Sequence, residues 1–74
     1  MEYLQLAKDQ FTNLQEELLD KNRHCLGGSD EREYDMDGEK FKIFIDAYWD
    51  RSEWFDYRVT NVYGDIVETG TYDF

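Results

Sequence analysis

The chain has 74 residues, and its 18 aspartates and glutamates against 8 lysines and arginines give a formal net charge of −10. Aromatic side chains make up 18% of the residues, which is too apolar for a disordered acidic tail and enough to fill the core of one small domain. This charge repels nucleic acids and anionic membranes and favours basic protein surfaces, most of which themselves bind nucleic acid.

The single cysteine, Cys25, excludes an intrachain disulfide. The sequence shows neither the pattern of a signal peptide nor the roughly 20 apolar residues that a membrane span needs. The chain has no proline and no low-complexity stretch that would mark a linker. We therefore expect a cytoplasmic protein that folds as one domain over residues 1–74.

Residues 2–26 are predicted to form one amphipathic helix. Apolar side chains recur there at steps of three and four residues, which is the period of a helix with one buried face. They are Leu4, Ala7, Phe11, Leu14, Leu18 and Cys25. Gly27-Gly28 is predicted to end the helix. The apolar stripe has two interpretations: it packs on a sheet of the same chain, or it forms the seam of a dimer of paired helices.

From residue 31 onward, apolar and polar residues alternate, which is the period of β-strands. We predict four strands at about 31–36, 39–48, 54–63 and 66–74. Two-residue turns at Asp37-Gly38 and Gly64-Asp65 and a longer loop at 49–53 join them. The expected fold is a four-stranded antiparallel meander over 31–74 with the helix on its apolar face, a two-layer α+β domain.

The turn lengths predict which residues lie opposite each other. On the helix side, Phe55 is expected opposite Ala47 and Phe74, Tyr57 opposite Ile45 and Tyr72, and Tyr63 opposite Ile66. On the other side, a row of three aspartates crosses three strands with neighbours roughly 5 Å apart. Its members are Asp46, Asp56 and Asp73, and the flanking aromatic residues are Phe44, Tyr48 and Trp54.

Like charges placed opposite each other destabilise a sheet, so the aspartate row works against folding. Aromatic side chains beside it are the anchors that protein interfaces favour. We interpret the aspartate row and its flanking aromatic residues as a partner-binding surface. The alternative is a solvated sheet face without a binding role.

Acidic residues occupy every second position from Glu31 to Glu39, which places them on one side of an extended strand. The predicted turn brings Lys40 opposite Asp35 and Lys42 opposite Glu33, which neutralises the middle of the run. Charge on an edge strand also protects it from edge-to-edge aggregation. What remains is a charged border to the binding surface, made by Asp30, Glu31, Asp37 and Glu39.

No pattern indicates catalysis or a cofactor. Adjacent helical residues such as His24 and Cys25 point about 100° apart, so they do not face each other as base and nucleophile. One histidine and one cysteine are too few for a structural zinc site. The acids at 33–37 begin like a calcium-binding loop, but its twelfth position is Phe44 instead of glutamate. We expect no metal, no cofactor and no enzymatic activity.

In size, acidity and lack of catalytic residues, the chain resembles small phage-encoded anti-defence proteins, including anti-CRISPR inhibitors and DNA mimics. The resemblance covers composition and expected architecture, with no diagnostic motif. It implies an inhibitor that docks on the basic nucleic-acid groove of a bacterial defence effector. Two alternatives stay open: an immunity or antitoxin protein that neutralises a basic nuclease, and a structural module that forms a homo-oligomer.

Overall fold

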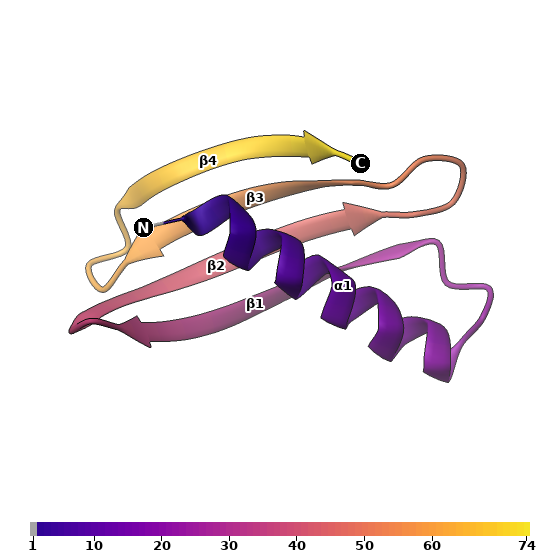
Figure 1. Ribbon diagram of the computed structural model, residues 1–74, viewed down its shortest axis with the longest axis horizontal. Helices are drawn as coiled ribbons and strands as arrows, with labels where there is room; N and C mark the ends of the chain where they lie inside the picture. The colour runs from indigo at the N-terminus through magenta and orange to yellow at the C-terminus, as the bar shows by residue number, and fades with distance from the viewer. Residues whose placement is uncertain (1) are drawn as a thin grey trace.

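The computed structural model describes residues 2–74, as one helix and one sheet (Figure 1). The helix is α1 (Tyr3–Lys21), and the strands are β1 (Gly27–Met36), β2 (Glu39–Tyr48), β3 (Trp54–Asn61) and β4 (Ile66–Asp73). All pairs are antiparallel, and the strands lie in the order β1-β2-β3-β4. The predicted α+β meander is therefore confirmed. No helix in residues 2–74 is long and apolar enough to cross a membrane.

The helix ends five residues earlier than predicted. Asn22 is extended, and its side-chain oxygen accepts a hydrogen bond from the backbone N–H of His24 at 3.0 Å. Asparagine commonly offers such a local alternative to the helical hydrogen bond. Cys25 thus lies in the connection after α1, where it is half-buried against the core.

Gly27-Gly28 does not close the helix; it begins β1, which was predicted to start only at residue 31. Gly27 pairs with Tyr48, and Gly28 pairs with Ala47. A Cβ atom on Gly28 would lie 2.6 Å from Cδ1 of Leu18, so the missing side chain lets α1 approach β1 closely. Gly28 allows close packing between helix and sheet, and Gly27 allows close approach of the β2 backbone at Ala47. The sequence pattern does not distinguish these roles from a helix stop.

The first two hairpins have the predicted register. Asp35 lies opposite Lys40, and Ile45 lies opposite Tyr57. Asp37 and Gly38 both have positive φ, at 53° and 80°, as a two-residue type I′ turn requires. Every outer-face pair predicted between β2 and β3 is present, so these faces are as expected.

The third hairpin differs from the prediction. Gly64, at φ 85°, closes a turn in which its N–H donates to the carbonyl of Asn61 at 3.0 Å. The Asn61 side-chain oxygen also accepts from the N–H groups of Tyr63 and Asp65. The loop therefore has three residues, a type I turn followed by a left-handed glycine, instead of the predicted two.

The longer loop and an irregularity between Val59 and Thr60 move the β3–β4 register by two residues. Phe55 lies opposite Tyr72, and Tyr57 lies opposite Gly70. A shift of two keeps each side chain from Glu68 to Asp73 on its predicted face. The expected apolar contact of Tyr63 with Ile66 is wrong, since these side chains are 85% and 61% exposed.

The core lies between α1 and the sheet. Its fully buried side chains come from the helix and from both central strands; among them are Phe11, Ile43, Ile45, Phe55 and Val59. The ring of Phe11 lies 5.5 Å from that of Phe55 and 4.8 Å from that of Phe74, measured between centroids. The helix stripe thus packs on the chain's own sheet, as the first interpretation of the stripe predicts.

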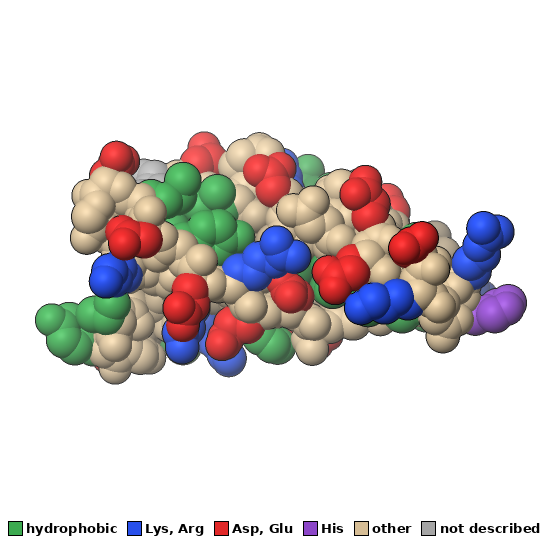
Figure 2. Space-filling model, turned by 90° about the horizontal axis from the view of Figure 1, so that it is seen from below, with side chains coloured by type: hydrophobic (Ala, Val, Ile, Leu, Met, Phe, Trp, Pro, Cys, Tyr) green, Lys and Arg blue, Asp and Glu red, His purple; other side chains and the backbone are tan. Residues whose placement is uncertain are grey.

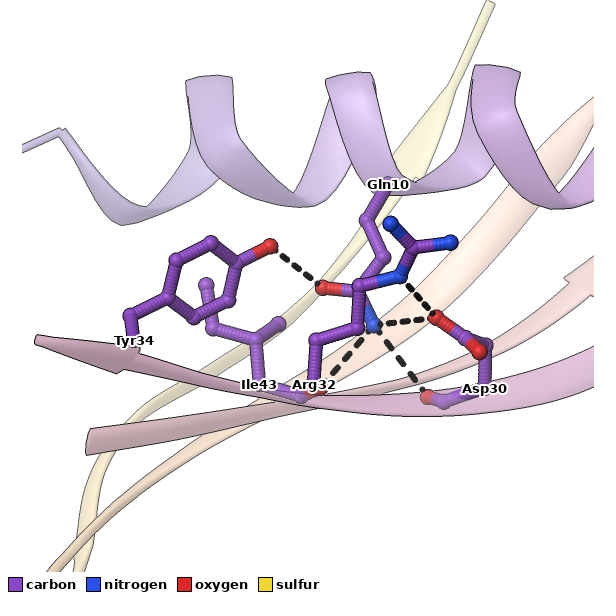
Figure 3. A network of polar contacts seen from close by, with 5 residues as sticks. All are labelled: Gln10, Asp30, Arg32, Tyr34 and Ile43. Carbon is purple, nitrogen blue, oxygen red and sulfur yellow. Dashed lines mark hydrogen bonds and ion pairs between the residues drawn. The ribbon is translucent and has the colours of Figure 1, made fainter.

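A polar residue that the stripe did not predict also lies in this layer. Gln10 is 1% exposed, and its amide nitrogen donates to the carbonyl of Ile43 and to a carboxylate oxygen of Asp30, each at 3.0 Å (Figure 3). Its oxygen accepts from the Tyr34 hydroxyl at 2.9 Å, and Arg32 pairs with Asp30. Burial raises the pKa of Tyr34, Arg32 opposes the rise and Asp30 adds to it. The network fixes the position of α1 on β1.

Candidate protein-binding surface

The sheet has one face covered by α1 and one that the helix leaves open (Figure 1). We call the open side the outer face. On β2 and β3 it presents the even-numbered residues, because alternate side chains point to opposite sides of a strand. The burial pattern agrees, since the odd-numbered neighbours from Phe41 to Ala47 are buried and the even-numbered ones are not.

At one end of the outer face, four side chains form what we call the acidic–aromatic patch: Asp46, Tyr48, Trp54 and Asp56. Asp46 lies directly opposite Asp56, and Tyr48 lies directly opposite Trp54. The two rings are tilted by 32°, with centroids 5.9 Å apart, and both side chains are half-buried. The patch thus joins two exposed carboxylates to a paired aromatic surface.

Neither carboxylate of the patch has a cationic partner. Within residues 2–74, ion pairs form at Glu17–Lys21, Asp30–Arg32 and Glu33–Lys42, and none includes Asp46 or Asp56. Asp56 does accept a short hydrogen bond from the hydroxyl of Thr71 on β4. That bond satisfies one carboxylate oxygen but brings no positive charge to the pair.

The predicted row of three aspartates is wrong in its last member. The two-residue shift of β4 places Thr71 opposite Asp56, and Asp73 lies opposite Trp54 instead. Asp73 stays exposed on the outer face beside the aromatic pair. The row is therefore a facing pair of aspartates, with a third carboxylate next to the patch.

Phe44 and Glu31 lie on the side of the patch nearer the middle of the sheet. Phe44 is opposite both Glu31 and Arg58, and the Arg58 guanidinium carbon lies 5.2 Å from the centroid of the Phe44 ring. This cation–π contact places a positive charge there, so the uncompensated acidic surface ends at this row. Phe44 therefore lies at the border of the patch, with the Arg58 guanidinium over its ring.

The charged border predicted from β1 is only partly next to the patch. Asp37 lies in the β1–β2 turn, and Glu39 begins β2, nine residues before Tyr48 and thus about 30 Å away along the strand. Asp30 is half-buried in the Gln10 network. Figure 2, seen from the side of β1, shows lysine and arginine side chains interspersed with the acids. The alternating acids from Glu31 to Glu39 therefore lie on an edge of mixed charge.

Asp50 also belongs to this region, although the sequence pattern did not predict it. Asp50, in the loop after β2, accepts a hydrogen bond from the Tyr48 hydroxyl at 3.3 Å. Partial burial, followed by the Asp50 carboxylate, raises the pKa of Tyr48. The spacing of two residues past a strand end was the available signal, but a loop conformation is needed to bring the groups together.

The described residues hold no cluster of metal ligands, and the surface hollow lies away from the acidic–aromatic patch. No group of three or more potential metal-ligating side chains gathers within residues 2–74. A surface hollow of about 590 Å³ lies between the two hairpin turns, where Glu33, Lys42 and Val62 are among its lining residues. It does not include any residue of the acidic–aromatic patch.

Comparison of the chain with protein-family models, with curated proteins and with solved structures finds no match. What the outer face offers to a partner therefore follows from its own geometry and charge. Two properties stand out there: facing carboxylates without counterions, and a pair of aromatic rings open to a partner.

Proposed function

We propose that this chain is a non-catalytic inhibitor that docks its acidic–aromatic patch on the basic nucleic-acid groove of another protein, in the manner of an anti-CRISPR protein acting on a bacterial defence effector. The observation that carries the proposal is the facing pair Asp46–Asp56, which has no cationic partner in residues 2–74. A partner's lysines and arginines would supply the missing counterions.

The energetics favour this interpretation of the pair. Facing like charges reduce the stability of the free sheet, by an amount that a binding partner of opposite charge would recover. Arginine is the best-suited partner residue, because its planar guanidinium pairs with carboxylates and also stacks on aromatic rings. Tyr48 and Trp54 offer such rings beside the carboxylates.

The overall charge of −10 suits the same role. Long-range attraction to a basic groove accelerates encounter, and this acceleration falls as salt screens the charges. Carboxylates on the patch would occupy the positions of phosphates, and the half-buried rings of Tyr48 and Trp54 would occupy sites where bases stack. Binding of this kind blocks the groove without any chemical step.

The test is capture of a bacterial partner by the immobilised chain, followed by binding measurements with the purified partner. We expect Asp46→Asn/Asp56→Asn to weaken binding at least tenfold, and nucleic acid to compete with the wild-type chain. The matched control is Glu16→Gln/Asp20→Asn, which removes two charges from exposed positions of α1 and should change affinity less than threefold.

Equal losses of affinity in the two variants would mean that binding depends on net charge and not on the patch. An unchanged affinity in the patch variant would overturn the proposal. The identity of the captured protein separates the two inhibitory roles. A CRISPR effector or another defence nuclease supports the proposed role, whereas a toxin encoded as a partner of this chain would assign it to the immunity proteins.

A further inference from the structure

The two edges of the sheet are protected to different degrees. Unpaired backbone N–H and C=O groups on an edge strand invite pairing with another strand, and charged side chains normally prevent it. The ten residues of β1 include four acids and Arg32. The eight residues of β4 include only Glu68 and Asp73, with no lysine, arginine or proline. The β4 edge therefore lacks the protection that β1 has.

The β4 edge is also open in space. Within residues 2–74, β4 pairs with β3 and with no other strand. The helix runs from the β3 side of the sheet toward β1 and leaves the outer side of β4 uncovered (Figure 1). Apolar side chains are exposed at both ends of the strand: Ile66 by 61% and Val67 by 48% at its start, and Phe74 by 57% directly after it. These are features of a strand that lacks a neighbour.

We propose that β4 is where two copies of this chain pair, antiparallel, around a two-fold axis that runs perpendicular to the sheet and passes between the Gly70 residues of the two copies. The two sheets then form one continuous sheet of eight strands. An axis of this kind puts both helices on the same side, because each residue lies opposite one that points to the same face. The inference is independent of the proposed inhibitory function.

The strand is self-complementary in this register. Thr69 lies opposite Thr71 of the second copy; both hydroxyls already donate within the chain, and the β-branched side chains suit packing across a pleated sheet. Glu68 lies opposite Tyr72 of the second copy, so no acid faces an acid there. Asp73 falls opposite Val67 of the second copy. The charge pattern of β4 thus permits pairing with itself.

Charge favours the β4 edge over the other surfaces as the place where two copies could meet. Two chains of net charge −10 repel each other, and the repulsion is greatest where acids gather, on β1 and on the acidic–aromatic patch. The β4 edge is the part of the sheet where that repulsion is smallest. Pairing there also leaves the outer face exposed, and it would place two patches on one continuous surface.

Sedimentation of the full chain over a concentration series tests the proposal, with twice the mass of one chain expected at high concentration. Thr69→Lys/Thr71→Lys places lysines opposite each other twice and should weaken the dimer at least tenfold. Glu31→Gln/Asp35→Asn changes the charge equally on the β1 edge and should leave the dimer intact. A monomer at every concentration, or equal weakening by both variants, would overturn the proposal.

Cysteine cross-linking tests the register even if the lysine variant fails to fold. In a Cys25→Ser background, a mixture of Thr69→Cys and Thr71→Cys chains should form mixed disulfides faster than either chain does alone. The reason is that positions 69 and 71 lie directly opposite only across the two copies, whereas identical positions lie diagonally. Cross-linking that is equally fast in the separate chains would contradict an axis at Gly70.

Discussion

Replacing Gln10 with leucine tests whether the buried amide holds α1 on the sheet. The substitution keeps most of the side-chain volume but removes the donor to Asp30 and Ile43 and the acceptor of the Tyr34 hydroxyl. Each lost hydrogen bond is worth about 0.5–1.5 kcal/mol, and more when one partner is a carboxylate. Burial of the leucine returns about 1 kcal/mol, so we expect a net loss of about 2–4 kcal/mol.

Urea unfolding followed by tryptophan fluorescence measures this loss. Trp49 is a suitable reporter because it is buried in the core, with its indole N–H donating to the carbonyl of Cys25 at 2.9 Å. Gln5→Leu is the matched control, since Gln5 is an exposed glutamine on the same helix. The control should change the free energy of unfolding by less than about 0.5 kcal/mol.

A double-mutant cycle with Tyr34→Phe isolates the hydrogen bond between the two side chains. Tyr34→Phe removes the hydroxyl that donates to Gln10, so the same hydrogen bond is lost in both single variants. The free energy of unfolding lost in the double variant should therefore be about 1 kcal/mol smaller than the sum of the losses in the two single variants. A Gln10→Leu cost within about 0.5 kcal/mol of wild type, or additive effects of the two substitutions, would refute the role assigned to the network.

Three further outcomes are expected. Asp46→Asn/Asp56→Asn should raise the free energy of unfolding by about 0.2–1 kcal/mol at low salt, and urea unfolding at two salt concentrations checks whether the gain shrinks with screening. Phe11→Ala should cost about 3–5 kcal/mol in thermal or urea unfolding, because the ring is 2% exposed; a cost under about 1 kcal/mol would remove Phe11 from the core. Burial, followed by the Glu68 carboxylate, raises the pKa of Tyr57 above 10.0, so its contribution to stability is present below that pH and is lost as pH rises toward the folded value. Unfolding measured through this alkaline range should therefore show a smaller loss in Tyr57→Phe than in the wild-type chain.

The periodicity of the sequence determined the elements and their faces. Phe11 and Leu14 fall on the buried stripe of the helix, and Ile43, Ile45 and Val59 fall on the covered face of the sheet, as predicted. Side-chain direction repeats with the local backbone geometry, so it is encoded within each element. The β1–β2 and β2–β3 registers also followed, the first from its two-residue turn and the second from the match of apolar residues across the loop.

The β3–β4 register and the end of the helix depended on side-chain hydrogen bonds that the pattern does not show. Asn61 and Asn22 each capture backbone N–H groups, which changes one loop from two residues to three and ends α1 at Lys21. The changed register also alters the candidate site, because β4 is displaced by two residues and Asp73 no longer lies in the predicted row of aspartates. Local hydrogen bonds of this kind compete with regular structure in ways that periodicity alone does not resolve.

The sequence by itself determined an acidic α+β domain with a facing aspartate pair and aromatic residues on its open face. Only the tertiary structure decided that Gln10 is a buried polar anchor, that Gly27 and Gly28 belong to a strand, and that Asp73 lies opposite Trp54. Those properties depend on which distant residues meet. The period of the hydrophobic residues gives the direction of each side chain within its own helix or strand. The contacts between elements are set by packing and by backbone pairing, which the period does not specify.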